Sequence, residues 1–159
     1  MISNAFISGM FARNIAMISE STAHMSHAQS LLAPHPKANC AHWLVGHLCV
    51  YRNRLLRLAG QAQTIPDEAV KRYVRDSAPV HGDEPGLTPF DVLRSALLAS
   101  QPLLVTGLSG LTTEQSLAPH TYPVATGELT LSVDEWFLFF MRHEAFHTGQ
   151  IELCAELVK

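Results

Sequence analysis

The sequence predicts an all-α protein, a four-helix bundle formed by a single domain that spans residues 1–159. Apolar residues recur at helical spacing in four long segments, and three Ser/Thr-x-x-Glu/Gln signatures mark places where helical turns begin. No segment shows a persuasive strand pattern. The chain has 159 residues and is 47% apolar, which is enough to bury a core without disulfides or a structural metal.

The first half of the chain is expected to form two long helices joined by a short turn. The first helix covers residues 4–25, where apolar residues recur every three or four positions. A capping-box pair, Ser26 and Gln29, starts the short turn. The second helix covers residues 37–59 and ends at Gly60, a residue type favoured just beyond a helix.

The second half is expected to form two more long helices after an irregular connection. The connection, residues 61–87, contains three prolines and is long enough to cross the bundle. The third helix covers residues 89–108, residues 116–131 form a loop or a short hairpin, and the fourth helix covers residues 133–158. The second and third helices could therefore be parallel to each other.

Composition and charge narrow the function classes. The net charge is −3 with no basic stripe, which argues against nucleic acid as a partner. No uninterrupted apolar run reaches about 18 residues, so no membrane span is expected, and the first residues lack the pattern of a signal peptide. The three cysteines form no Cys-x-x-Cys pair, and they indicate reduced thiols in a cytoplasmic protein: Cys40, Cys49 and Cys154.

Histidine is the unusual residue type, with nine in the chain. His143 and His147 lie four residues apart in the fourth helix, on one apolar stripe with Trp136 and Phe140. His47 lies on the apolar stripe of the second helix. The three side chains are therefore expected in the middle of buried faces, pointing into one bundle interior.

Three histidines in one interior favour a metal site. Each neutral imidazole needs both a donor and an acceptor partner in a dry core, whereas one bound cation satisfies three ring nitrogens at once. An i, i+4 pair can converge on a single ion at about 2.0–2.1 Å. The spacing thus predicts that His47, His143 and His147 bind a metal, while His42, about 140° further round its helix, faces elsewhere. The remaining histidines have no expected role beyond surface or loop hydrogen bonds: His24, His27, His35, His81 and His120.

The segment His143–His147 also matches His-Glu-x-x-His, the pattern in which the glutamate is the general base of a zinc protease. The extended pattern fails here, because Gln150 and Leu153 stand where glycine and histidine belong. Only twelve residues follow His147, which leaves no room for a downstream glutamate ligand. A protease is therefore disfavoured, and Glu144 is a weak catalytic candidate whose alternative is a solvated residue at the rim.

Two neighbours of His147 have their own interpretation. Gln150 shares the stripe and is a candidate to orient a ligand imidazole, although it could equally be an ordinary packing residue. Glycine in the middle of a helix, as at Gly149, lowers helix stability by about 1 kcal/mol relative to alanine. A close approach of a neighbouring helix would explain a glycine there, and it is therefore expected.

Two segments together carry a family resemblance. NCAHWLVGHLCVYRNRLLRLAG, residues 39–60, followed much later by RHEAFHTGQI, residues 142–151, resembles the DinB/YfiT-like superfamily of four-helix-bundle metalloproteins. The resemblance implies that His47, His143 and His147 bind a divalent metal, nickel or zinc. It also implies an up-down-down-up bundle, with a long crossover between the second and third helices, that is frequently dimeric. It also implies a small-molecule substrate and, in several relatives, a low-molecular-weight thiol such as bacillithiol, mycothiol or glutathione.

Three function classes follow from these residues. Three neutral ligands leave an open position on the metal, where a thiol could be held as thiolate for transfer or a water could be activated for hydrolysis. The resemblance favours the thiol-dependent S-transferase over the hydrolase. The second class is a non-enzymatic metal- or ligand-binding bundle, and the third is a purely structural bundle whose core histidines bind nothing. Arg13, Arg52, Arg54 or Arg142 could meet the carboxylate of a thiol, or could be exposed charges.

Overall fold

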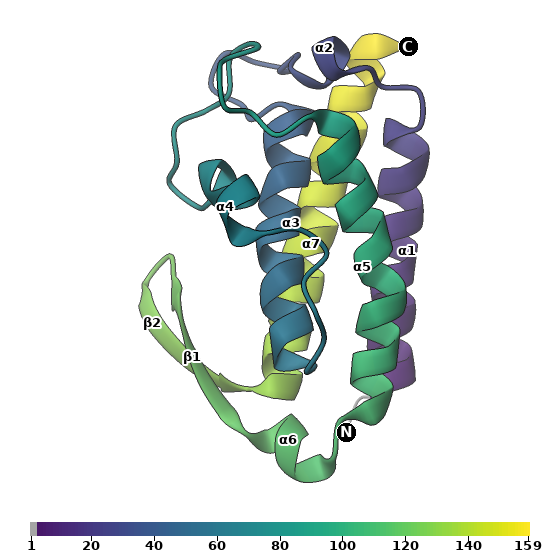
Figure 1. Cartoon of the computed structure of the whole chain (residues 1–159), viewed down its shortest axis with the longest axis vertical. Helices are drawn as coiled ribbons and strands as arrows, with labels where there is room; N and C mark the ends of the chain where they lie inside the picture. The colour runs from purple at the N-terminus through teal and green to yellow at the C-terminus, as the bar shows by residue number, and fades with distance from the viewer. Residues whose placement is uncertain (1–2) are drawn as a thin grey trace.

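The computed structural model describes residues 3–159 as a bundle of helices with one small hairpin (Figure 1). The four long helices are α1 (Asn4–Thr22), α3 (Ala41–Leu58), α5 (Phe90–Gly110) and α7 (Val133–Ala155). The short elements are α2 (His27–Ser30), α4 (Asp67–Val70), η1 (Lys71–Tyr73), α6 (Thr113–Leu117), β1 (Pro119–Val124), β2 (Gly127–Ser132) and η2 (Glu156–Val158).

Each long helix packs against two others, so the bundle closes around its interior. α1 contacts α5 and α7, and α3 contacts the same two helices from the other side. In Figure 1 the chain rises through α1, descends through α3 and again through α5, and rises through α7 to the C-terminus. The long connection between α3 and α5 returns along the outside of the bundle and packs α4 and η1 against α3.

The helix starts follow the capping signals closely. Ser26, Thr112 and Ser132 each accept a hydrogen bond from the backbone N–H three residues on, and the partner glutamine or glutamate bonds back in all three cases. The start of α3 differs from the expectation. It begins at Ala41 rather than at residue 37, because the preceding residues turn and Cys40 adopts an extended backbone conformation.

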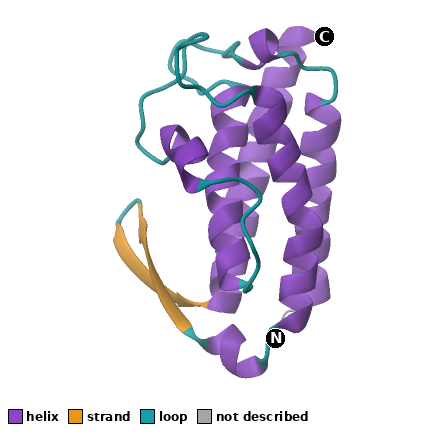
Figure 2. Cartoon of the chain, in the orientation of Figure 1, coloured by secondary structure: helices purple, strands orange, loops and turns teal. Residues whose placement is uncertain are grey.

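The region that the sequence left open between a loop and a short hairpin contains the antiparallel hairpin of β1 and β2 (Figure 2). Pro119 pairs with Ser132 and Val124 with Gly127, and Gly127 has a φ of +120°, which glycine adopts without steric cost. Trp136 of α7 fixes the base of the hairpin, since its Nε1–H donates to the His120 carbonyl at 2.8 Å.

The core consists of two hydrophobic clusters with polar side chains between them along every long helix. One cluster contains Leu44, Leu48, Leu93, Leu97 and Ile151, and the other contains Phe11, Leu56, Leu104, Trp136 and Phe137. The sequence positions between the clusters hold buried polar residues: Asn14 on α1, Arg52 on α3, Ser100 on α5 and Glu144 on α7. This central polar region lies at the same level as the histidines.

Among residues 3–159, α5 is the one helix long and apolar enough to cross a membrane by length and composition. It packs against α1 and α3 and buries Leu93, Leu97 and Leu104 in the core. A core helix of this kind passes the same test, so α5 is weak evidence for a membrane span.

Candidate metal centre

His47 comes from the middle of α3, where its side chain is buried. Its Nδ1 lies 2.7 Å from the backbone carbonyl oxygen of Tyr73. Because a carbonyl oxygen only accepts, Nδ1–H is the donor, and the lone pair of Nε2 is left free. Gly46 makes this contact possible, since a Cβ at that position would lie 2.4 Å from the Tyr73 ring.

His143 and His147 come from consecutive turns of α7, and their Nε2 atoms are 3.0 Å apart. The Nδ1 atom of His147 lies 2.7 Å from Oε1 of Gln150, one turn further along the helix. An amide oxygen accepts, so this contact places the proton on Nδ1 and leaves Nε2 of His147 unprotonated, facing Nε2 of His143. Gln150 therefore stands where the sequence placed an orienting partner.

The three imidazoles form a donor set suited to a divalent ion. One ring nitrogen from each of His47, His143 and His147 lies within 4.8 Å of the other two. The 3.0 Å between the two α7 nitrogens is close to the ~3.3 Å that separates two nitrogen ligands of a tetrahedral zinc ion. Within residues 3–159, Nδ1 of His143 is buried without a hydrogen-bond partner. The other ring nitrogen of His143, Nε2, is the one that faces the cluster.

Burial keeps the imidazoles neutral, which metal binding requires. Desolvation lowers the pKa of His47 to about 4, and the nearby charges of Arg54 and Arg75 act in the same direction. Desolvation, the other two imidazoles and Arg142 lower the pKa of His143 to about 3. The pKa of His147 is also lowered by burial, although the hydrogen bond that it donates to Gln150 acts in the opposite direction.

Glu144 is not a solvated rim residue, as the sequence alternative had it. Its carboxylate is buried and accepts two hydrogen bonds from Arg52, from Nε at 2.6 Å and from Nη2 at 2.8 Å. Arg52, expected either at a thiol or exposed to solvent, instead also donates to Oε1 of Gln101 and lies over the Phe11 ring. Glu144 is thus engaged inside the bundle and does not face the imidazoles as a free base.

The buried face of α7 is rotated relative to the stripe inferred from the sequence. Phe137, Phe140, Glu144 and Ile151 face the interior, because α7 packs between α1 and α3. His143 is half-buried at the edge of this face rather than at its middle. This position at the edge gives the imidazoles access to solvent-facing space.

That space is a groove of about 750 Å³ beside the three histidines. One wall is α3 and α7, and the others are the β1–β2 hairpin and the segment that follows η1. Its lining includes the side chains of His47, His143, His147 and Gln150. The volume suits a small organic molecule.

Sequence reasoning missed two aromatic neighbours of the ligands. The Trp43 ring stacks on His47 with centroids 4.4 Å apart, and the Tyr51 ring lies 4.4 Å from His143. Trp43, His47 and Tyr51 are spaced four residues apart on α3, so helical spacing could have found them. No local signal could have found Tyr73, since the long connection carries it to His47.

His42 lies outside the cluster, as its helical angle predicts, but it is fully buried. Its Nε2 lies 2.9 Å from the Tyr73 hydroxyl and its Nδ1 lies 3.3 Å from Oγ of Ser30. Tyr73 therefore joins His42 to His47 through its two oxygen atoms. The expected close approach at Gly149 is wrong, because nothing lies within 4 Å of a Cβ built there.

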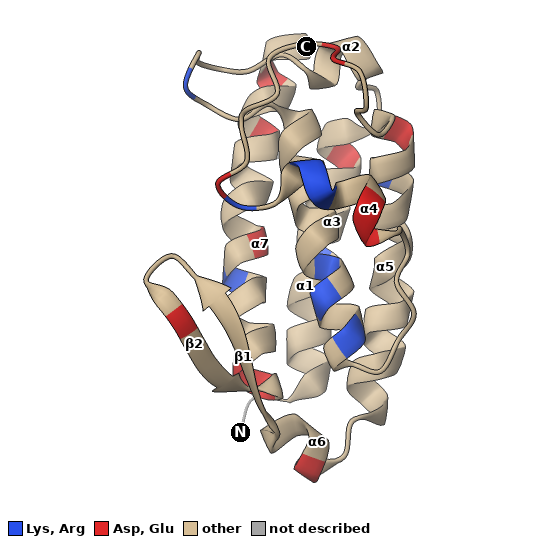
Figure 3. Cartoon of the chain, turned by 60° about the vertical axis from the view of Figure 1, so that its left-hand side comes forward, with Lys and Arg blue, Asp and Glu red and all other residues tan. Residues whose placement is uncertain are grey.

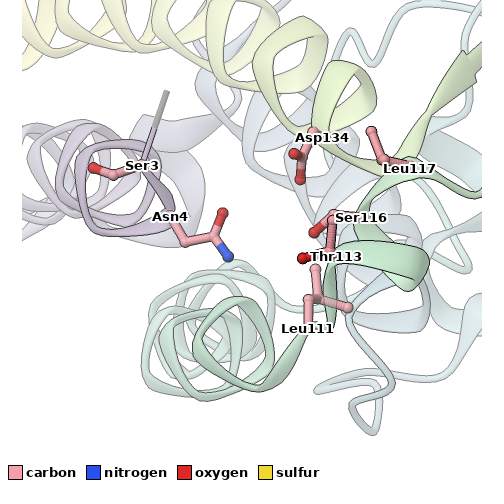
Figure 4. Close-up of a pocket in the computed structure, with 7 residues that line it drawn as sticks. All are labelled: Ser3, Asn4, Leu111, Thr113, Ser116, Leu117 and Asp134. Atoms are coloured by element: carbon pink, nitrogen blue, oxygen red, sulfur yellow. The ribbon is translucent and has the colours of Figure 1, made fainter. Parts of the chain in front are cut away.

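A second cavity of about 390 Å³ lies between the start of α1, α6 and the start of α7 (Figure 4). Its lining contains one carboxylate, that of Asp134, and hydroxyl and amide side chains such as Ser116 and Asn4. The histidine cluster remains the one metal-competent group found among residues 3–159.

Comparisons with known proteins agree with this architecture. The family profile described as the DinB superfamily matches residues 10–151. Among curated proteins, none matches the chain in sequence. The crystal structure of a conserved protein from Enterococcus faecalis superposes with a TM-score of 0.70 and 16% identity, covering 99% of this chain and 98% of that one. That likeness concerns the fold.

Proposed function

The chain belongs to the DinB superfamily, and on that basis we propose that it is a metal-dependent enzyme whose divalent ion is bound by His47, His143 and His147. The observation that carries the proposal is the convergence of three neutral imidazoles at the side of a groove. A site that only stabilised the fold would need no such access. We take nickel or zinc as the metal, since imidazole ligands suit both.

A divalent ion held by three neutral ligands keeps its full charge and an open position, where it can act as a Lewis acid and lower the pKa of a bound thiol or water. The chain's own residues hold and shape this position. Tyr73 and Gln150 fix the tautomers of His47 and His147 through their Nδ1 atoms. The rings of Trp43 and Tyr51 pack against His47 and His143 and help to hold these imidazoles in place.

The reaction we favour is transfer to or from a low-molecular-weight thiol, with hydrolysis as the alternative. Glu144 is held by Arg52, so the groove lacks an evident free carboxylate base beside the imidazoles. This supports chemistry centred on the metal and the group in its open position. The preference for a thiol over water comes from the family resemblance, and a non-enzymatic binding protein is a further alternative.

The surroundings of the site support the further assignments. All three cysteines are free and buried, which suits a reducing compartment, and we infer a cytoplasmic protein. Leu153 and Leu157 expose apolar surface near the end of the chain, which supports a homodimer. A small-molecule substrate fits the groove volume, and the net charge of −3 disfavours nucleic acid.

Metal analysis of variants tests the assignment of ligands. The purified protein should contain one divalent metal per chain, and His47→Ala and His143→Ala should each lose it. His42→Ala and the exposed His120→Ala should keep it, because neither residue belongs to the cluster. Unchanged metal content in both ligand variants would overturn the assignment.

Turnover assays separate the reaction classes. Metal-loaded protein is incubated with an electrophilic acceptor plus bacillithiol, mycothiol or glutathione, and separately with simple esters and amides. Metal-dependent turnover only in the thiol set supports transfer, and turnover only in the second set supports hydrolysis. No turnover in either set, with metal bound, would favour the binding protein.

A further inference from the structure

The groove beside the histidines has a charge opposite to that of the whole protein. Its lining contains three cationic side chains, Lys37, Arg75 and Arg142, and a single carboxylate, that of Asp76. The chain as a whole carries a net charge of −3. The charged residues of α3 are all arginines (Figure 3), but none of the three lines the groove, so its charge comes from the other segments of the lining. Positive charge is therefore concentrated at the groove against the average of the molecule.

Two of these cations flank the imidazoles. Arg142 directly precedes His143 on α7, and Arg75 follows Tyr73, whose carbonyl orients His47. Both guanidiniums belong to the same groove lining as the three imidazoles. Because the three histidines are neutral, they add no negative charge that would offset the positive charge of Arg75 and Arg142.

The one acidic side chain in the lining leaves this charge available. Asp76 lies 3.4 Å from Nε of Arg75, and both side chains are exposed, at 85% and 44%. An ion pair between exposed groups is weak, because water screens it. Arg75 can therefore exchange Asp76 for a ligand carboxylate, while Arg142 forms no ion pair within the described part of the chain.

The remaining lining is aromatic. Trp43, Tyr51, Phe139, Phe140 and Phe146 all face the groove, and Phe146 is 61% exposed. Pro123, Val124 and Leu129 of the hairpin also line the groove. Such walls bury the apolar body of a ligand, and an exposed phenyl ring at the entrance gains by being covered.

We propose that the groove binds a small amphiphilic carboxylate, with its anionic group at Arg75 and Arg142 and its apolar body between the aromatic wall and the hairpin. This assigns a substrate class to the same site and so rests on the proposed function. Two arginines supply a charge-assisted contact for the carboxylate, and the aromatic residues set the preference for an apolar body. The body then lies next to the three imidazoles.

Calorimetric titration with matched probes tests the charge requirement. The probes are 4-phenylbutanoate and 4-phenylbutan-1-ol, which share one body, and the protein is titrated both zinc-loaded and metal-free. We expect the carboxylate to bind at least about tenfold more tightly than the alcohol in both forms. Acetate, which lacks the body, should bind more weakly than 4-phenylbutanoate. Equal affinities for the carboxylate and the alcohol would overturn the proposal.

Variants locate the anionic group. Arg75→Gln with Arg142→Gln should abolish the preference for the carboxylate while leaving metal content unchanged. The matched control, Arg13→Gln with Arg57→Gln, removes two exposed arginines that do not line the groove and should retain the preference. A preference that survives the first pair, or that exists only with zinc bound, would assign the carboxylate elsewhere and contradict the proposal.

The two proposals fail in different ways. Discrimination between the probes with no metal in the purified protein would remove the metal function and keep the anion site. Full metal content with equal affinities for the two probes would remove the anion site and keep the metal function.

Discussion

The guanidinium of Arg52 and the carboxylate of Glu144 form a two-point ion pair, with contacts of 2.6 and 2.8 Å, inside the bundle. Both side chains are almost fully buried, and they join α3 to α7, the two helices that supply the histidines. The pair lies one residue from His143 along α7. It therefore fixes how the two ligand-bearing helices sit against each other.

Removing one partner of this pair should destabilise the fold without removing the metal. Glu144→Gln leaves the Arg52 charge buried and uncompensated, and we expect a loss of ~3 kcal/mol in the free energy of unfolding. Chemical denaturation of metal-free protein measures it, and metal content is measured alongside. Glu128→Gln, an exposed change on β2, is the control and should have little effect.

The companion variant tests the same pair from the other side. Replacing both partners, as Arg52→Met with Glu144→Leu, should restore much of the stability, because no charge is left buried.

If Glu144→Gln keeps its fold and metal yet loses turnover, Glu144 takes part in proton transfer and the structural interpretation is wrong.

Chelation should abolish activity or ligand binding and leave the helices in place. The two hydrophobic clusters and the Arg52–Glu144 pair connect the helices without the metal. Far-ultraviolet circular dichroism should change little on treatment with a chelator, while metal content falls to zero. Cooperative loss of the helical signal would instead make the metal a structural element.

Acid should destabilise the metal-free protein in a window set by its buried histidines. Burial, with the nearby His27, lowers the pKa of His42 to about 4, below its value of about 6.5 in an unfolded chain. As pH falls from about 6.5 to about 4, the unfolded chain takes up a proton that the folded protein does not, so stability is lost. His42 alone accounts for up to ~3 kcal/mol across this window.

Denaturation at several pH values measures this loss. His42→Gln should reduce the dependence of unfolding free energy on pH between about 4 and 6.5, and the exposed His81→Gln should not. An unchanged slope in the His42 variant would contradict the assignment.

Two glycines should respond oppositely to alanine. Gly46→Ala brings a Cβ within 2.4 Å of the Tyr73 ring, so Tyr73 must move and its carbonyl leaves His47. We expect lower stability and weaker metal binding. Gly149→Ala meets nothing within 4 Å and should stabilise α7 by up to ~1 kcal/mol. Thermal unfolding and metal titration measure both, and a harmless Gly46→Ala would refute the role given to Tyr73.

The sequence by itself determined the helices and the residues of the candidate site. Periodic apolar residues and capping pairs such as Ser132 with Glu135 act within one or two turns, so they predict where helices form without knowledge of their neighbours. The i, i+4 spacing of His143 and His147 is also local. His47 could be joined to them only through its place on an apolar stripe and through the family resemblance.

Only the tertiary structure decided which face of each helix is buried and which residues from distant parts of the chain complete the site. The buried arc of α7 depends on its contacts with both α1 and α3, and this turned Glu144 inward and left His143 at the edge. Helical periodicity predicts which residues of α7 share a face. It does not predict how that face is oriented toward α1 and α3 together. The contacts of Arg52 with Glu144 and of Tyr73 with His47 join residues far apart in the chain, and no local pattern encodes such contacts.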